Sequence, residues 1–322
     1  MAAVNSVLAV TTSPTSAGLA HLTEHTTKYV EAGLQGAPNT ARAYAGDWRR
    51  FTEWCTAHAQ VALPASVDTL AGFVTHLAEA GKKVSTIQRS CAAISKAHAL
   101  RDLASPTDDK KFKVLMDGIS RLKGVRQKQA PAFSLASFKR TLKHLDATTP
   151  AGLRDKVILL LGFTGAFRRS ELSALDMDDL SFSEDGLTIN LKRSKTNQLG
   201  GAEEKAIFYS PDPALCPIRT LQAWLRLLER TSGPILVSFR KGGRLTDRRL
   251  TDVHLNKIVQ RHLGPKFTAH SLRASFVTVA KLNGADDSEV MNQTKHKTSE
   301  MIRRYTRLDN VRQHNAAQKL GL

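Results

Sequence analysis

Residues 163–180 read FTGAFRRSELSALDMDDL, and they follow an almost wholly apolar run over residues 157–163. A short run of this kind predicts a buried helix. The chain therefore leaves a buried helix and passes directly into two arginines, Arg168 and Arg169, which Ser-Glu-Leu follows. Taken alone, Ser-Glu-Leu also fits an ordinary helix start that Ser170 caps. The basic residues farther along the chain decide which interpretation to prefer.

An ordered set of basic residues and one tyrosine follows Arg168. Its members are Lys195, His270, Arg273, His296 and Tyr305, and the last two are nine positions apart. Taken singly each residue is weak evidence, because in a chain with 47 Lys and Arg residues an arbitrary lysine is most often a solvated surface residue. His270 and Arg273 are three positions apart, so on a helix they share a face and one phosphate can contact both.

Together these residue types fit the cleavage of a phosphodiester. The planar guanidinium of arginine holds phosphate oxygens in bidentate fashion and keeps its proton. A lysine whose pKa falls among other cations can protonate the leaving 5′-oxygen. A tyrosine, with an ordinary pKa of about 10, can supply the nucleophile. Donors placed in advance around the non-bridging oxygens are usually the largest catalytic term.

The charge of the chain points to the same kind of substrate. Lys plus Arg is 47 and Asp plus Glu is 29, which gives a formal net charge of +18. Such a field attracts a polyanion, usually nucleic acid. A ribosome-associated protein or a membrane-surface binder is the alternative, but no amphipathic basic helix dominates and no apolar run is as long as a membrane span. We expect a cytoplasmic, DNA-associated protein without membrane contact.

The cysteines and the first residues give no sign of a disulfide-rich, zinc-binding or secreted protein. Cys55, Cys91 and Cys216 lie far apart without CxxC spacing, so neither a disulfide framework nor a zinc site is expected. Residues 1–20 are rich in Ala, Ser and Thr and lack a basic segment before their short apolar stretch. We interpret them as a flexible arm and not as a signal peptide.

Apolar stripes at the helical period predict a helical domain over residues 21–123. Asn39 or Thr40 is expected to cap its first helix. Each stripe covers one face, so each helix must pack against others. The stripes are Tyr44, Trp48, Phe51 and Cys55; Val67, Leu70, Val74 and Leu77; Val84, Ile87, Cys91 and Ile94; and Phe112, Leu115, Ile119 and Leu122.

A basic linker over residues 124–133 is expected to lead into a mixed domain over residues 134–322. Passing along a phosphate backbone, the linker would contact DNA through Arg126 and Lys128. Alternation at residues 187–191 predicts a strand, with a partner at residues 206–209. Helices are predicted near residues 135–145, 157–163, 218–228, 248–262, 271–282 and 287–293. The expected fold is mainly α with a small antiparallel β-sheet.

The ordered residues and their surroundings resemble the tyrosine recombinase (phage integrase) family. Residues 163–180 resemble its first arginine box, RSKT at 193–196 its β-hairpin lysine, and HSLR at 270–273 its second box. The resemblance extends from about residue 25 to the end. It implies Arg168 and Arg273 as phosphate clamps, Lys195 as general acid, His270 as an aid to proton transfer, His296 as a donor to a non-bridging oxygen, Tyr305 as nucleophile, and Glu171 as the carboxylate that steadies the basic groups.

The N-terminal helices resemble the core-binding, SAM-like domain of the same family. In that comparison the stretch KVSTIQR at 83–89 opens a helix that enters the major groove. Ser85, Gln88 and Arg89 share its polar face, and Arg and Gln are capable base readers. We therefore predict DNA contacts by these three residues and by Lys83.

Two positions depart from the family pattern. Ala166 stands where the first box more often has Gly, and Lys295 replaces the Gly that commonly precedes the late His. Neither change removes a catalytic group.

The resemblance implies that Tyr305 attacks the scissile phosphate to give a 3′-phosphotyrosine and a free 5′-hydroxyl. The bond energy stays in the adduct, so no cofactor, ATP or metal is required. It also implies duplex DNA as partner, a homotetramer on paired sites and, in some members, accessory DNA-bending or directionality proteins. We expect residues 309–322 to dock on a neighbouring protomer.

Three rival functions remain open on the sequence. A related enzyme with the same site could act as a type IB topoisomerase and relax DNA as a monomer. A DNA-binding regulator could keep the fold without catalysis, although all six catalytic positions are filled here. A basic RNA- or ribosome-binding protein is the third rival, and a preference for duplex DNA would exclude it.

Overall fold

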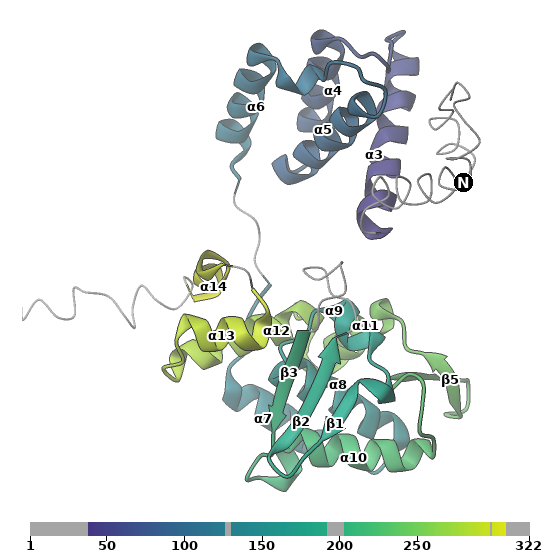
Figure 1. The fold of residues 1–322 in the computed structure, drawn as a ribbon, viewed down its shortest axis with the longest axis vertical. Coiled ribbons are helices and arrows are strands. Elements are labelled where there is room, and N and C mark those ends of the chain that lie inside the picture. Colours follow the sequence, from purple (N-terminus) through teal and green to yellow (C-terminus); the bar gives the residue numbers. More distant parts are fainter. Residues whose placement is uncertain (1–37, 126–129, 192–202, 297, 307–322) are drawn as a thin grey trace, which may run out of the picture. The chain divides into compact units, whose positions relative to one another are not determined.

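The computed structural model describes residues 38–125, 130–191, 203–296 and 298–306, which belong to two compact units (Figure 1). The division falls between residues 127 and 128. Each unit has its own hydrophobic core. In the described part of the chain no helix is long and apolar enough to cross a membrane.

The first unit is built from helices whose apolar stripes meet in one core. These helices are α3 (Pro38–Ala57), α4 (Val67–Glu79), α5 (Val84–Ala99) and α6 (Lys110–Lys123). Phe51, Phe73 and Ile87 are fully buried, and the rings of Phe51 and Phe73 meet edge to face at 5.0 Å. The four predicted helices are therefore confirmed, and the apolar stripe of each packs against the others in one core.

Two details of the helical unit differ from expectation. α3 begins at Pro38, so Asn39 and Thr40 lie inside its first turn and do not cap it. Proline suits a first helical position because its φ is already helical and its missing N–H is not needed there. Leu122, predicted to be part of the core, is 91% exposed, because the stripe of α6 finds buried neighbours only as far as Ile119.

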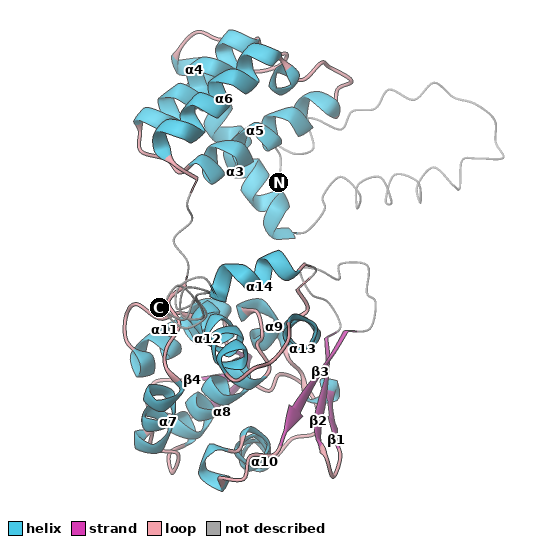
Figure 2. Cartoon of the chain, turned by 90° about the vertical axis from the view of Figure 1, so that its left-hand side faces the viewer, coloured by secondary structure: helices cyan, strands magenta, loops and turns pink. Residues whose placement is uncertain are grey.

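The second unit combines helices with two small sheets (Figures 1 and 2). Its core contains Trp224, whose indole N–H donates to Ile235 O at 2.8 Å. Cys55, Cys91 and Cys216 of the two units are buried and carry free thiols. The helices of the second unit are α7 (Leu135–His144), α8 (Pro150–Thr164), α9 (Arg169–Ala174), α10 (Pro217–Leu228), α11 (Asp252–Leu263), α12 (Ala269–Leu282), α13 (Asp287–Thr294) and α14 (Ser299–Thr306).

The larger sheet has three antiparallel strands, β1 (Leu180–Phe182), β2 (Gly186–Leu191) and β3 (Glu203–Phe208), in that order. The predicted strand at 187–191 and its partner are confirmed. β3 begins three residues earlier than expected, at Glu203, because it pairs with the whole of β2. Figure 1 shows α13 beside one end of β3 and α10 near the other.

The smaller sheet pairs β4 (Val237–Phe239) with β5 (Leu245–Arg249). The predicted helix over residues 248–262 is wrong at its start, because Arg248 and Arg249 belong to β5. The hydroxyl of Thr251 accepts the backbone N–H of His254 at 3.2 Å, which fixes the start of α11 after the strand. β1 and β4 are each three residues long, too short for alternation to predict.

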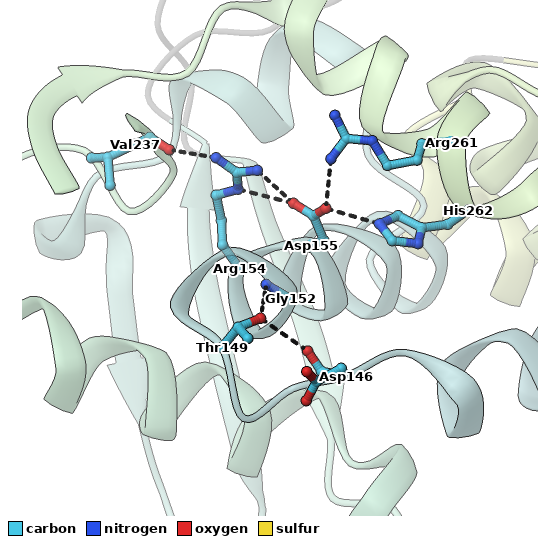
Figure 3. A network of polar contacts seen from close by, with 8 residues as sticks. All are labelled: Asp146, Thr149, Gly152, Arg154, Asp155, Val237, Arg261 and His262. Atoms are coloured by element: carbon cyan, nitrogen blue, oxygen red, sulfur yellow. Dashed lines mark hydrogen bonds and ion pairs between the residues drawn. The ribbon is translucent and has the colours of Figure 1, made fainter. Parts of the chain in front are cut away.

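A buried polar cluster ties α8 to α11 and β4 (Figure 3). Asp155 of α8 accepts Nε and Nη2 of Arg154, at 3.0 and 2.6 Å, through Oδ1, and its Oδ2 lies 2.8 Å from His262 Nε2. Arg154 Nη1 donates to Val237 O at 3.3 Å. Burial alone would raise the pKa of Asp155, but His262 and Arg154 lower it below its ordinary value. The carboxyl group of Asp155 is therefore ionised, and its cluster links α8, α11 and β4 inside the unit.

Candidate active site

Arg168 lies on the turn between α8 and α9. The buried carboxylate of Glu171 accepts the backbone N–H of Arg168 at 2.9 Å through Oε2 and its Nη1 at 2.5 Å through Oε1. A helix does start here, but Glu171 and not Ser170 reaches back to cap it. One carboxylate thus fixes both the backbone and the guanidinium of Arg168.

Arg273 reaches this turn from α12. It is 2% exposed, and its Nη1 donates to Ala166 O at 2.8 Å, two residues before Arg168. His270 lies one turn earlier on the same helix, with an exposed side chain. Partial desolvation and then the charges of Arg273 and Arg168 lower the pKa of His270 below its ordinary value. The three predicted residues therefore share one electrostatic environment.

His296 joins them from the turn after α13. Its Nδ1 lies 2.9 Å from the hydroxyl of Thr294, which itself donates to Val290 O. Because the hydroxyl proton is used there, we assign the Nδ1–H tautomer to His296. Burial first, and then the charges of Arg273, Arg168 and two other cations, lower the pKa of His296 to about 3. The ring is therefore neutral at pH 7.

The two positions that depart from the family pattern share one backbone conformation. Ala166 has φ 47° and Lys295 has φ 54°, so both adopt the left-handed conformation that glycine enters without strain. Both residues keep a polar role through the backbone, since Ala166 O accepts from Arg273 and Lys295 O accepts from Nη2 of Arg168 at 3.3 Å. The turns at Ala166 and Lys295 therefore keep the left-handed conformation without glycine, at some cost in backbone strain.

Lys205 of β3 is part of this cluster, although the sequence did not single it out. It is 1% exposed. Burial lowers its pKa to about 7, against the opposing charge of Glu171 and with the help of Arg273, Arg168 and Lys295. One sequence signal existed: strand alternation places Lys205 on the same face as the buried Ile207. Lys205 was missed because the strand was predicted to start at residue 206.

Other predicted residues fall outside the described part. Lys195, Arg126 and Lys128 lie outside the residues that the structure describes, so their roles stay predictions. Tyr305 lies in α14, three positions after Ile302, and its side chain is also outside the description. Ile302 is fully buried against Val277 and other residues of α12 and α13, which anchors α14 to the unit.

In the helical unit, the predicted DNA-reading residues Lys83, Ser85, Gln88 and Arg89 are exposed at the start of α5. Arg89 donates through Nε and Nη2, at 2.6 and 3.1 Å, to the carboxylate of Asp47 on α3. This pair gives the guanidinium of Arg89 a defined direction. Whether it contacts DNA stays a prediction.

Two family models match the chain. The phage integrase family matches residues 135–312, and the N-terminal SAM-like domain of phage integrases matches residues 27–100. The chain belongs to the phage integrase family. The matched ranges include the basic cluster in the second unit and the start of α5 in the first.

Relatives agree with this assignment. An integrase/recombinase XerD homolog of Selenomonas ruminantium is 34% identical over 293 residues, covering 88% of this chain and 86% of the relative. Tyrosine recombinase XerD of Lacticaseibacillus casei is 27% identical and covers 87% and 91%. This member of the phage integrase family is accordingly a tyrosine-type site-specific recombinase.

Solved structures share the fold at low sequence identity. XerH recombinase, in a post-cleavage complex with its palindromic difH substrate, has a TM-score of 0.62 at 20% identity and covers 86% of this chain and 79% of its own. Lambda integrase (75–356), as a dimer bound to a core site, has a TM-score of 0.56 at 15% identity, covering 88% and 93%. At these identities the likeness concerns the fold.

Proposed function

We propose that this recombinase cuts and rejoins duplex DNA through a covalent 3′-phosphotyrosine on Tyr305, without metal or ATP. The observation that carries the proposal is the convergence of Arg168, His270, Arg273 and His296, from three separate segments, on one turn. Arg168 and Arg273 keep their charge, and their guanidinium groups bring donors suited to phosphate oxygens to the same turn as the two histidines. A phosphodiester is the anion that this recombinase must bind.

The proposed reaction needs only groups of the protein and of its DNA substrates. The phenolate oxygen of Tyr305 forms a bond to phosphorus while the bond to the 5′-oxygen breaks, and Lys195 donates the proton that the leaving oxygen takes up. Arg168 and Arg273 hold the non-bridging oxygens as charge develops there. The 5′-hydroxyl of a partner duplex then attacks the phosphotyrosine, returns its proton to Lys195 and releases the Tyr305 phenolate.

His296 has to change its protonation state to take its proposed part. In the free protein its Nδ1–H points to Thr294, so a donor at Nε2 requires an added proton. The negative charge of a bound phosphate offsets the arginines and raises the pKa of His296 from about 3. Phosphate binding at this site is therefore linked to proton uptake, and we expect binding to tighten as the pH falls through the raised pKa that His296 has in the complex.

The test uses nicked duplexes built from candidate recombination sites, incubated with the protein in EDTA. We expect a protein–DNA adduct that survives boiling in SDS, formed by the wild type and absent in Tyr305→Phe. Arg168→Ala should slow adduct formation by about 10²–10³-fold, as removal of one preorganised donor does elsewhere.

Arg169→Ala is the matched control for Arg168→Ala. Arg169 is the next residue, but its side chain is 46% exposed and pairs with Asp252 at the surface. We expect adduct formation close to the wild-type rate. Equal losses in the two variants, or specific DNA binding without any wild-type adduct, would contradict the proposed chemistry and favour a non-catalytic regulator. Relaxation of supercoiled DNA without partner exchange would favour the topoisomerase alternative.

We further propose that residues 309–322 of a second copy contribute to assembly on paired sites. A mostly apolar groove of about 790 Å³, lined by residues of α7, α8, α12, α13 and β3, is open at the surface of the second unit, which we call the catalytic unit. Phe208 in its lining is 68% exposed. The tail carries Val311 and Leu320, and Leu308 directly precedes it; these apolar side chains suit such a groove. A chain truncated before Asn310 that still assembles fully on paired sites would refute this.

A further inference from the structure

The side chains of Lys205 and Gln293 are both bound to backbone carbonyl groups beside the candidate active site. Lys205 Nζ donates to Gly165 O at 2.8 Å and to Gln293 O. Gln293 Nε2 donates to Thr164 O at 2.9 Å and to Ala206 O at 2.8 Å. These four hydrogen bonds join the end of α8, the strand β3 and the end of α13. We call Lys205 and Gln293 the backbone clamp.

A lysine at this place needs an explanation. Lys205 is 1% exposed, and taking an ammonium group out of water costs several kcal/mol unless partners compensate. Its partners are the two carbonyl groups and the ring of Phe167, whose centroid lies 5.1 Å from Nζ. All of these contacts lie where the end of α8, the strand β3 and the end of α13 meet. The amine of Lys205 therefore holds these three elements together.

The clamp joins the two turns that carry proposed catalytic groups. The end of α8 leads into the turn of Arg168, and the end of α13 leads through Lys295 to His296. The same two turns are cross-linked again by Arg273, which donates to Ala166 O, and by Arg168, which donates to Lys295 O. A shift at the junction would therefore move Arg168 and His296 relative to each other.

We propose that Lys205 and Gln293 are positioning residues for strand cleavage, which hold the Arg168 turn against the His296 turn without touching the phosphate. The inference rests on the proposed function of this site. Lys205 acts through other residues because its amine is buried and already donates to two carbonyl oxygens. A misplacement of about 1 Å in a reacting group costs on the order of 10²-fold in rate.

Three variants of the clamp test the proposal. Lys205→Met removes the amine but keeps most of the side-chain volume, Lys205→Arg restores a charged donor, and Gln293→Met removes the amide. Thr220→Val is the matched control, since it deletes a buried hydrogen bond from Thr220 Oγ1 to Cys216 O, at 2.8 Å, at the start of α10. Each variant is assayed for its single-turnover rate of adduct formation on saturating nicked duplex and for its affinity for the intact duplex.

We expect Lys205→Met to slow adduct formation by about 10²-fold while DNA affinity stays at the wild-type value. Gln293→Met should slow it in the same way, and Lys205→Arg should recover most of the rate. Thr220→Val should cleave like the wild type. A loss of rate without a loss of affinity, together with rescue by arginine, is what a positioning role requires and a general loss of stability does not give.

Two results would overturn the proposal. One is a Lys205→Met protein that cleaves at the wild-type rate. The other is a Lys205→Arg protein as slow as Lys205→Met, because arginine keeps its proton and can replace a structural donor but not a proton-transfer group. If Lys205→Met does not fold, Gln293→Met decides, and wild-type cleavage by that variant rejects the clamp.

The wild type and Tyr305→Phe, run in parallel, separate this proposal from the proposed function. An adduct that depends on Tyr305 but not on the clamp rejects the clamp alone. No adduct with the wild type rejects the covalent mechanism, and the clamp proposal with it.

Discussion

Each unit contains a buried carboxylate bound by cationic side chains, and the two differ in where those cations lie. In the catalytic unit, Asp155 pairs with Arg154, whose side chain is 4% exposed, and with His262 (Figure 3). In the helical unit, Asp47 pairs with Arg50 and Arg89, whose side chains are 47% and 46% exposed. The carboxylates themselves are 3% and 1% exposed.

The difference shows that similar ion pairs can serve opposite purposes. Where both partners are buried, as with Asp155 and Arg154, the pair links elements inside one unit, and losing either partner leaves an isolated charge. Where only the carboxylate is buried, as with Asp47, the pair holds exposed guanidinium groups in a fixed direction. Arginines held in this way are suited to contact phosphates or base edges.

The strongest test of this contrast is Asp155→Asn. Arg154 would stay buried without a counter-charge, so we expect the catalytic unit to lose about 3–5 kcal/mol of unfolding free energy. Hydrogen exchange read by mass spectrometry in a urea series measures this for peptides of α8, with peptides of α3 as internal control. A loss below about 1 kcal/mol would mean that Arg154 is not isolated by the change.

Asp47→Asn should have a smaller effect on stability and a larger one on DNA. The change removes charge-assisted bonds to half-exposed arginines, worth about 1.5–3 kcal/mol in total, since water takes over part of the solvation. We expect the orientation of Arg89 to be lost and discrimination between specific and unrelated duplexes to fall. Competition binding at fixed salt measures this, and unchanged discrimination would argue against base reading by Arg89.

Acid should weaken both carboxylate clusters. In each case burial raises the pKa of the carboxyl and its cationic partners lower it, with the net result below the ordinary value. The stabilisation is therefore fully present above the ordinary pKa of about 3.9, and is lost as the pH falls through the lowered value. Unfolding free energies between pH 5 and 3 should fall less steeply in Asp155→Asn than in the wild type for peptides of α8.

The smallest effects should come from the exposed partners. Arg261 lies 3.6 Å from Asp155 with a side chain that is 60% exposed, and Arg50 lies 2.8 Å from Asp47. Exposed ion pairs contribute about 0–1 kcal/mol, so Arg261→Ala and Arg50→Ala should each change the stability of their unit by less than that. A loss as large as that of Asp155→Asn would place the energy of the cluster in its exposed member.

Periodicity predicted the elements that are long enough to repeat. The stripes of α4 and α5 and the alternation of β2 appear where expected, since each extends over several turns or several alternating positions. β1 and β4 were missed because three residues hold no period, and Arg248–Arg249 were assigned to a helix because their pairing partner in β4 lies elsewhere in the sequence. Leu122 was misjudged because a stripe predicts which face is apolar but not where its partners end.

The amino-acid sequence by itself determined the family, the order of Arg168, His270, Arg273, His296 and Tyr305, and the helix that carries Arg273, since these depend on residue type and local spacing. The tertiary structure alone decided which groups support them. Lys205 meets Gly165 and Gln293 across 40 and 88 positions, and Arg273 meets Ala166 across 107. Contacts of this kind arise from packing between distant segments, and no local pattern of residues encodes them.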